Sequence, residues 1–296
     1  MNENEQQPKK DVIYAKGLKG VIATETGLSD VRGEQGHLLY CGYEIEDLVD
    51  LCSFTEIIYL LLNKRLPNRE ELAGLEQRLR NDRELPQPIL DFFKTATKTA
   101  RPMSALRTAV SMLGMYDDRT KDPSQMKEIG LSLIAKLPVM AAYYYRICQG
   151  LDLPPIRTDL GEAEHFLWLL KGTEPDPAEA HILDVAYILH ADHGMNASTF
   201  SARVTASTLS DMYSAITSAI GSLKGPLHGG ANEAVIEMLK EIGEEENVEE
   251  YINRKLANKE KIFGIGHRVY KTLDPRAPLL RRIAIRLTQT IGEPKW

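Results

Sequence analysis

The sequence predicts a mainly α-helical protein with one small β-hairpin near its N-terminus. Apolar residues recur at helical spacing in several segments after residue 43, and most of these segments begin at a capping residue or an Asp-Pro pair. Only residues 21–43, with the turn glycines Gly33 and Gly36, have the character of short strands. Runs of β-branched residues alternating with helices, as a Rossmann unit requires, are absent from the sequence. Helices packed on helices are therefore expected.

The first two predicted helices carry clear start signals. Asn68 and Glu71 form a capping box ahead of apolar residues that recur on one face as far as Leu79. Asp176 and Pro177 provide an N-cap and a first-turn proline for a second helix.

Further along the chain, two more helices and one break are predicted. Ser210 is expected to open a helix that ends at Gly225, and Asp274 with Pro275 opens another. Pro138 lies within a long helical pattern and is expected to divide it into two helices, because proline removes a backbone hydrogen bond.

The predicted helix after Ser210 is rich in small side chains, which allow close approach of a second helix. A tightly packed core helix and a subunit interface explain this pattern equally well. The small residues are Ser214, Ala215, Ser218, Ala219, Gly221 and Ser222.

Composition indicates a soluble globular protein. Of the 296 residues, 43% are hydrophobic and 26% charged, and no apolar run approaches the length that spans a bilayer. The polar residues 1–14 are predicted to form a disordered tail. Three scattered cysteines suit a reducing compartment, so a cytoplasmic protein is expected, and the net charge of −6 argues against general nucleic-acid binding.

Charge is distributed unevenly near the C-terminus. Residues 241–250 carry six acids, whereas residues 254–286 carry ten Lys and Arg against two acids. A solvated basic face and a site for a phosphorylated anion are both compatible with this run.

Three of the seven histidines lie in segments rich in glycine and polar residues. The first segment, ADHGMNASTF at residues 191–200, follows an apolar helix and holds His193 and Asn196 in a short loop. Asp192 or Ser198 could simply cap the next helix. Taken alone, His193 fits a structural role better than a functional one.

The second segment, LKGPLHGGANEAV at residues 223–235, places His228 just before a helix expected to start near Ala231. The helix dipole disfavours the cationic imidazole, so His228 would be a neutral hydrogen-bond donor able to stabilise an enolate-like oxygen. A loop histidine beside a glycine-rich helix end is equally compatible.

The third segment is KIFGIGHRVYKTLDPRAPLLRR at residues 261–282. Gly264 and Gly266 expose backbone beside His267, although a lone G-x-G is a weak signal. Arg276 falls in the first turn of the next helix, where a guanidinium and orphan backbone N–H groups together form a seat for a carboxylate or phosphate.

These segments together indicate chemistry on a carbonyl compound that carries carboxylates. Histidine acid–base groups and an anion-binding arginine suit such a substrate. The sequence has no metal-binding HExxH or CxxC motif, no G-x-S-x-G elbow and no P-loop. The basic run would suit a ligand with phosphates, such as coenzyme A.

The three segments resemble the histidine motifs of the citrate synthase family. GPLHGGANE and GIGHRVYKTLDPR are similar to its two catalytic-histidine motifs, and ADHGMNASTF to its substrate-histidine segment. The stretch GLKGVIATETGLSDVRGEQGHLLYCGYEIEDL resembles the family's N-terminal signature. The resemblance runs from about residue 17 to the end and is strongest to the shorter, bacterial type.

This resemblance implies a two-domain, mainly helical homodimer whose domains close on the substrate. Residues 15–228 would form the large domain and residues 229–296 part of the small one. The helix of small residues would then lie at the dimer interface.

The resemblance also implies a role for each motif residue. His228 would polarise the thioester carbonyl of the acyl-CoA, and His267 would protonate the oxaloacetate carbonyl as the new bond forms. His193, Arg276 and Asn196 would bind oxaloacetate.

Coenzyme A would be held through backbone groups of the segment before His267. No metal or separate cofactor is implied, because the coenzyme A thioester is itself a substrate. The segment consists of Ile262, Phe263, Gly264, Ile265 and Gly266.

Several positions depart from the family pattern. Gly194 stands where the family often has Glu, Ile265 where an aromatic is commoner, and Cys41 where an arginine is frequent. Family members also continue beyond the position that matches Trp296, and that portion carries the aspartate that removes the methyl proton. The 296-residue chain alone is therefore expected to be inactive or nearly so.

The expected reaction joins acetyl-CoA, oxaloacetate and water to give citrate and free coenzyme A in the tricarboxylic acid cycle. One alternative is 2-methylcitrate synthase, which uses propionyl-CoA and shares these motifs. Another is a non-catalytic, truncated subunit that binds coenzyme A or dimerises.

Overall fold

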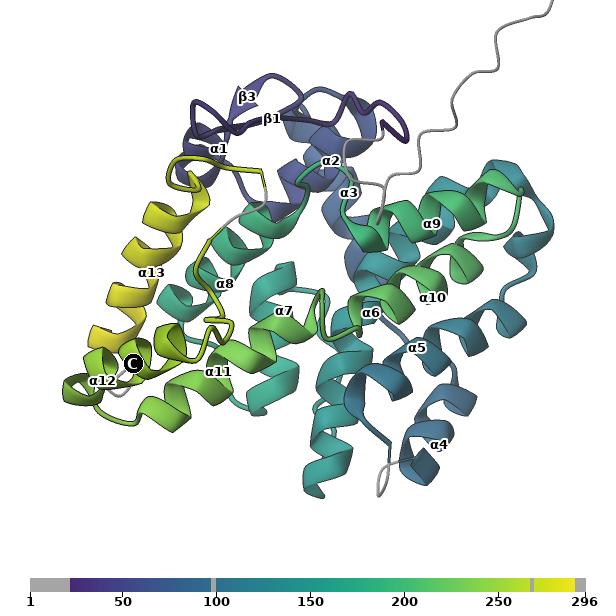
Figure 1. Ribbon diagram of the computed structural model, residues 1–296. Coiled ribbons are helices and arrows are strands. Elements are labelled where there is room, and N and C mark those ends of the chain that lie inside the picture. Colours follow the sequence, from purple (N-terminus) through teal and green to yellow (C-terminus); the bar gives the residue numbers. More distant parts are fainter. Residues whose placement is uncertain (1–21, 97–99, 267–268, 291–296) are drawn as a thin grey trace, which may run out of the picture.

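The computed structural model describes residues 22–96, 100–266 and 269–290, and Figure 1 shows a largely helical molecule with a small sheet at one end. Within these ranges there are thirteen α-helices, α1 to α13, and one three-stranded sheet. The mainly α-helical prediction is confirmed. The tail predicted for residues 1–14 lies outside the described residues.

The N-terminal sheet contains the predicted hairpin and one further short strand. Its antiparallel strands are β1 (Ser29–Arg32), β2 (His37–Tyr40) and β3 (Tyr43–Glu44), in that spatial order. The β1–β2 turn closes with a hydrogen bond from the Gly36 amide to the Arg32 carbonyl (2.9 Å), and Gly36 has a φ of +72° that favours glycine.

The helical part follows in chain order. Its α-helices are α1 (Ile45–Leu51), α2 (Phe54–Asn63), α3 (Arg69–Asn81), α4 (Gln87–Ala96), α5 (Pro102–Leu113), α6 (Met126–Gln149), α7 (Glu162–Lys171), α8 (Pro177–His190), α9 (Ala197–Ser207), α10 (Met212–Leu223), α11 (Gly230–Ile242), α12 (Val248–Ala257) and α13 (Arg276–Thr290). Short 3-10 turns are η2 (Gly114–Tyr116), η3 (Asp118–Lys121), η4 (Pro123–Gln125) and η5 (Glu245–Asn247).

Local capping explains several helix starts. Asn68 and Glu71 form the predicted reciprocal capping box on α3, with both bonds at 2.9 Å. Asp176 caps α8 by accepting from the Ala178 amide at 2.8 Å. Helix α10 starts slightly later than predicted, because Asp211 rather than Ser210 is its N-cap.

The predicted break at Pro138 is wrong. Helix α6 runs unbroken through this proline for 24 residues. Val139 and Met140, directly after the proline, are fully buried in two different hydrophobic clusters. Tertiary packing on several sides of α6 therefore outweighs the one backbone hydrogen bond that proline removes.

Two large hydrophobic clusters form the core. One joins the sheet, α1 and α2 to α8 and α13, through residues such as Leu38, Ile188 and Leu279. The other joins α4, α5, α6 and α10, with Phe93 at its centre. In Figure 1 the first group lies on the left and at the top, and the second on the right.

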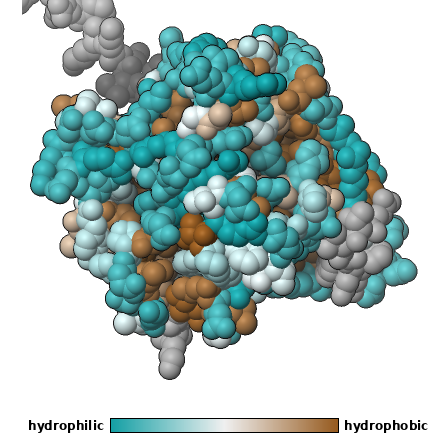
Figure 2. All heavy atoms as spheres, turned by 180° about the vertical axis from the view of Figure 1, so that it is seen from behind, coloured by the Kyte–Doolittle hydropathy of each residue, from teal (hydrophilic) through white to brown (hydrophobic). Residues whose placement is uncertain are grey.

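The surface is mixed in character. Figure 2 shows the rear face as mostly hydrophilic, with hydrophobic side chains gathered in its lower part and at its upper right. None of the described helices is both long and apolar enough to cross a bilayer.

A buried arginine fixes the connection between α6 and α7. Arg83 is fully buried, and its guanidinium donates to the carbonyls of Arg157 (2.7 Å) and Leu160 (3.0 Å) and to a carboxylate oxygen of Glu162 (2.5 Å). Burial raises the pKa of Glu162, although the charge of Arg83 opposes this shift. Removal of either partner would leave an uncompensated buried charge.

His165 on α7 belongs to the same region and is buried in its neutral form. Its Nε2 accepts a long hydrogen bond from the Arg157 amide (3.4 Å). Burial, and then the charges of Arg83 and Arg157, lower its pKa from 6.5 to about 3. Between pH 6.5 and about pH 3, the imidazole of His165 is therefore protonated in the unfolded chain but neutral in the folded protein.

The contribution of His165 to stability should be complete above pH 6.5 and fall away progressively toward pH 3. His165→Gln should accordingly weaken the dependence of the unfolding free energy on pH between these limits, as measured by urea unfolding at pH 7.5 and 5. His181→Gln, at an exposed position on α8, is the matched control. Equal pH dependence in the two variants would contradict the assignment.

Candidate functional site

Hydrogen bonds fix the backbone of the loop that follows α8 and carries His193. The Tyr40 hydroxyl on β2 donates to the Ile188 carbonyl (3.1 Å) and accepts from the Asp192 amide (3.2 Å). The Gly194 amide donates to Ser29 Oγ (2.9 Å) and to Asp192 Oδ1 (3.0 Å). The residues on both sides of His193 are thus held by hydrogen bonds, and Gly194 has a φ of +67° that favours glycine there.

Tyr270 contacts His193 directly. Its hydroxyl lies 3.1 Å from His193 Nε2, and the two rings meet edge to face with centroids 5.4 Å apart. Tyr270 is buried, and burial raises the pKa of its phenol to about 12. The hydroxyl therefore stays protonated at neutral pH and can donate to the imidazole.

Arg276 lies where the sequence predicted, as the first residue of α13. Its guanidinium forms a bidentate pair with Asp274 at 3.0 and 2.7 Å, and both side chains are 19% exposed. Burial opposes its charge, but the hydrogen bonds and charge of Asp274 outweigh this and raise its pKa. The same positive charge opposes the burial that raises the pKa of the Tyr40 and Tyr270 phenols, so both phenols lie within range of its charge.

These side chains, without Tyr40, form one group, called here the His193 cluster: His193, Tyr270, Asp274 and Arg276. His193 contacts Tyr270, and the charge of Arg276 acts on the same phenol, while the predicted binding of oxaloacetate by both residues stays a prediction. A partly buried guanidinium beside an imidazole and a phenol provides several donors for a small anion.

His228 lies in the turn between α10 and α11, and its imidazole is half-buried. Its Nε2 lies 2.6 Å from Ser198 Oγ on α9, and its amide donates to the Gly225 carbonyl (3.0 Å). The turn requires Gly229, because a Cβ there would lie 2.5 Å from the Leu223 carbonyl oxygen. The predicted position of His228 just before a helix is confirmed.

Asn196, and not Ser198, caps the helix that follows the His193 loop. Asn196 is the N-cap of α9, since its Oδ1 accepts from the Thr199 amide (2.9 Å). Ser198 is therefore not the cap and is available to His228. The predicted contact of Asn196 with oxaloacetate stays a prediction.

The segment predicted to bind coenzyme A is an exposed turn beside α11. Gly264 and Gly266 have φ values of +79° and +88°, and Ile265 is 70% exposed. A Cβ at Gly264 would touch the Val235 side chain at 3.4 Å, so the turn lies against α11. The glycines allow a backbone path unfavourable to other residues, which is consistent with ligand contact through main-chain groups.

His267 lies outside the described residues. Its predicted role therefore rests on the sequence motif alone. Among the parts that are described, no group of three or more His, Cys, Asp or Glu side chains is arranged to hold a metal ion.

Sequence reasoning did not identify Tyr40, Tyr270 or Ser198 as functional candidates. Tyr270 and Ser198 lie within the histidine segments, so their proximity along the chain was an available signal. Tyr40 reaches the site from a distant strand and carries no such signal.

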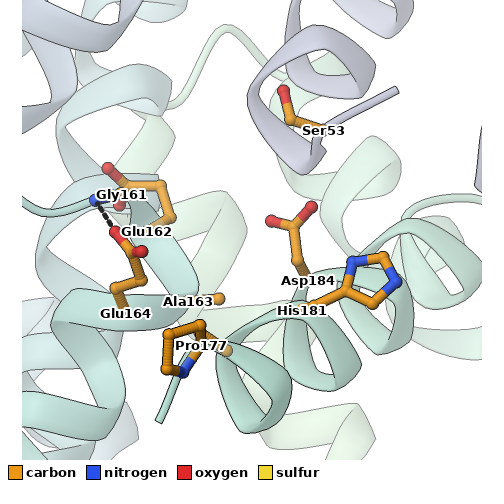
Figure 3. A pocket seen from close by; sticks show the side chains of 9 residues that line it. Ser53, Gly161, Glu162, Ala163, Glu164, Pro177, His181 and Asp184 are labelled. Carbon is orange, nitrogen blue, oxygen red and sulfur yellow. Dashed lines mark hydrogen bonds between the residues drawn. The ribbon is translucent and has the colours of Figure 1, made fainter. Parts of the chain in front are cut away.

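Figure 3 shows a separate pocket of about 250 Å³ near the starts of α2, α7 and α8. Its polar groups serve helix starts: Asp184 accepts from the Phe54 amide (3.0 Å) and Glu164 from the Gly161 amide (2.9 Å). The lining residues are Ser53, Gly161, Glu162, Ala163, Glu164, Pro177, Ala180, His181 and Asp184. Neither the His193 cluster nor His228 borders this pocket.

Comparison with known proteins identifies the family. The family model described as "Citrate synthase, C-terminal domain" matches residues 17–296. Citrate synthase 2 of Bacillus subtilis is 51% identical over 284 residues, which cover 95% of this chain and 76% of that protein. 2-Methylcitrate synthase 2 of Corynebacterium glutamicum is 42% identical, with coverage of 95% and 75%.

A solved structure agrees with the sequence comparison. Citrate synthase from Thermoplasma acidophilum, in a ternary complex with carboxymethyl coenzyme A and oxaloacetate, superimposes with a TM-score of 0.88 at 32% identity, covering 95% of this chain and 74% of that one. With the family model spanning nearly the whole sequence, this chain belongs to the citrate synthase family, whose members are acyltransferases that form a carbon–carbon bond.

Proposed function

We propose that this protein condenses acetyl-CoA with oxaloacetate and water to give citrate and coenzyme A. The observation that carries the proposal is the short chain from His193 to Ser198. One end contributes to a cluster of donors suited to a dicarboxylate, and the other end holds His228. Two substrates bound at these ends would lie next to each other.

In this proposal oxaloacetate binds at the His193 cluster. Asp274 occupies the Nε and Nη2 edge of Arg276, so a substrate carboxylate would approach the remaining guanidinium donors. His193, oriented by Tyr270, supplies a further hydrogen bond. Bidentate and charge-assisted contacts of this kind position a substrate as well as hold it.

His228 is assigned to the thioester carbonyl of the acyl-CoA. When Ser198 donates its hydroxyl proton to Nε2, the neutral imidazole carries its own proton on Nδ1 and can donate it to the carbonyl oxygen. The methyl group loses its proton to a carboxylate base, which family members carry beyond the position that matches Trp296; negative charge then develops on that oxygen, and this hydrogen bond stabilises it. A hydrogen bond in this direction gives the tautomer that the reaction needs.

The remaining steps complete the reaction. The enol carbon attacks the ketone carbon of oxaloacetate, and His267 is proposed to protonate the ketone oxygen. Water then cleaves the thioester to release citrate and coenzyme A, whose adenine end would be held by backbone groups of residues 262–266.

Assembly and location also belong to this proposal. We expect a cytoplasmic homodimer acting in the tricarboxylic acid cycle, with a large domain of residues 15–228 and a small domain starting at 229. Helix α10 uses one of its small residues within the chain, since Ser218 bonds Ser201 of α9 (2.5 Å), and the place of its small-residue face at the dimer interface stays a prediction. Helix α9 and the turn after it still expose Phe200, Val204 and Leu209, which supports an interface there.

The acyl substrate can be decided by kinetics on the native protein. We expect kcat/KM for acetyl-CoA to exceed that for propionyl-CoA by about 10–200-fold, the usual effect of one methylene in an apolar pocket. The reverse order would make the protein a 2-methylcitrate synthase, a possibility supported by relatives of that name. Binding of coenzyme A without any turnover would instead favour a non-catalytic subunit.

Ser198→Ala should lower kcat about fivefold, because the loss of one well-placed hydrogen bond is worth about 1 kcal/mol. The matched control is Ser201→Ala on the same helix, which removes a bond to Ser218 rather than to His228. Steady-state kinetics with both substrates measures the effect. Equal losses in the two variants would remove Ser198 from the mechanism.

Arg276→Leu should raise the KM for oxaloacetate strongly and affect that for acyl-CoA much less, because the lost guanidinium binds only the dicarboxylate. Arg282→Leu is the control on the same helix, where Arg282 pairs with Asp50 at the surface. An equal rise in both KM values for Arg276→Leu would indicate collapse of the start of α13 instead of a lost substrate contact.

A further inference from the structure

We propose that the N-terminal three-stranded sheet is a positioning element for oxaloacetate: it holds His193 and Tyr270 against each other while making no contact with the substrate itself. The inference rests on the proposed function of the His193 cluster. It assigns positioning roles to Ser29, Gly33 and Tyr40, none of which is a catalytic residue.

The sheet holds the His193 loop through one side chain from each of two strands. Ser29 and Tyr40 are directly paired across β1 and β2, so their side chains lie on the same face of the sheet. Tyr40 binds the amide before His193, and Ser29 binds the amide after it. One cross-strand pair therefore fixes the backbone on both sides of the imidazole.

Tyr40 is suited to this task because it is a fully satisfied buried group. Its side chain is completely buried, and its hydroxyl both donates to the last turn of α8 and accepts from the Asp192 amide. Burial raises the pKa of the phenol to about 12, so the donor persists at neutral pH. Without the hydroxyl, a backbone amide next to the site would lose its partner.

The β1–β2 turn of the same sheet contacts the segment around Tyr270. The Lys271 amide donates to the Gly33 carbonyl (3.0 Å), and Lys271 also pairs with Glu34. A Cβ at Gly33 would lie 2.3 Å from the Val269 carbonyl oxygen, closer than real contacts allow. The β1–β2 turn therefore contacts the backbone of Val269 and Lys271, the residues on either side of Tyr270.

The same hairpin fixes the backbone around His193 and around Tyr270, whose side chains then meet at 3.1 Å. His228 is held elsewhere, by Ser198 of α9 and the turn after α10. A disturbance of the sheet should therefore weaken oxaloacetate binding and spare the acyl-CoA half of the site.

Tyr40→Phe tests this inference, with Tyr143→Phe as the matched control. Tyr143 is also buried, and its hydroxyl donates to the Pro154 carbonyl (2.6 Å) in a different hydrophobic cluster. Both variants lose one buried hydroxyl and should lose similar stability. Only Tyr40→Phe should weaken oxaloacetate binding, about tenfold, as measured by calorimetry and by its KM, with the acyl-CoA KM nearly unchanged.

Gly33→Ala provides a second variant that leaves every hydrogen-bonding side chain in place. It should also raise the KM for oxaloacetate selectively, because the added methyl group pushes the Val269 backbone away. Gly74→Ala on α3 is its control, since a Cβ there meets nothing within 4 Å. Unchanged oxaloacetate binding in both Tyr40→Phe and Gly33→Ala would overturn the inference, as would an equal rise in the KM of both substrates.

An NMR measurement that needs no substrate distinguishes failure of the proposed function from failure of the positioning role of the sheet. In protein labelled with ¹⁵N-histidine, the His193 ring signals, assigned with His193→Gln, report its tautomer and pKa. Tyr40→Phe should shift these signals and Tyr143→Phe should not, whatever the ligand. If native protein fails to bind oxaloacetate, the proposed function is wrong, and these signals still decide the positioning role: no shift in Tyr40→Phe overturns it.

Discussion

The shared hydrophobic core of the N-terminal sheet, α8 and α13 is the constraint on which the rest of the site depends. Leu38, Ile188 and Leu279 come from three distant parts of the chain and are buried together. Their burial offsets the entropy cost of closing two long loops. Because these residues pack together, the loop after α8 that carries His193 and the start of α13 that carries Arg276 lie on the same side of the molecule.

Several helix starts could be predicted from the sequence because they depend on residues that are close together in the chain. The capping boxes and Asp-Pro starts needed only a few consecutive residues, and the structure confirms those at Asn68 and Asp176. The helix through Pro138 was misjudged because the decisive contacts come from other helices. A local breaker is overruled when its surroundings are buried on several sides.

The site was only partly predictable for the same reason. The motifs supplied the histidines and Arg276, and the family resemblance supplied their grouping. Tyr40 could not be found this way, because its two hydrogen bonds span about half of the chain. Ser198 and Asn196 were ambiguous as caps, and only the geometry shows that Asn196 caps α9 and leaves Ser198 for His228.

The close contact between Gly33 and the Val269 backbone has a consequence for the order in which the protein assembles. The two residues are separated by most of the sequence, and such non-local pairings form slowly because a long loop must close first. During synthesis the hairpin and α8 emerge well before the segment that bears Tyr270. The His193 loop therefore cannot form its contact with Tyr270 until that later segment has been synthesised.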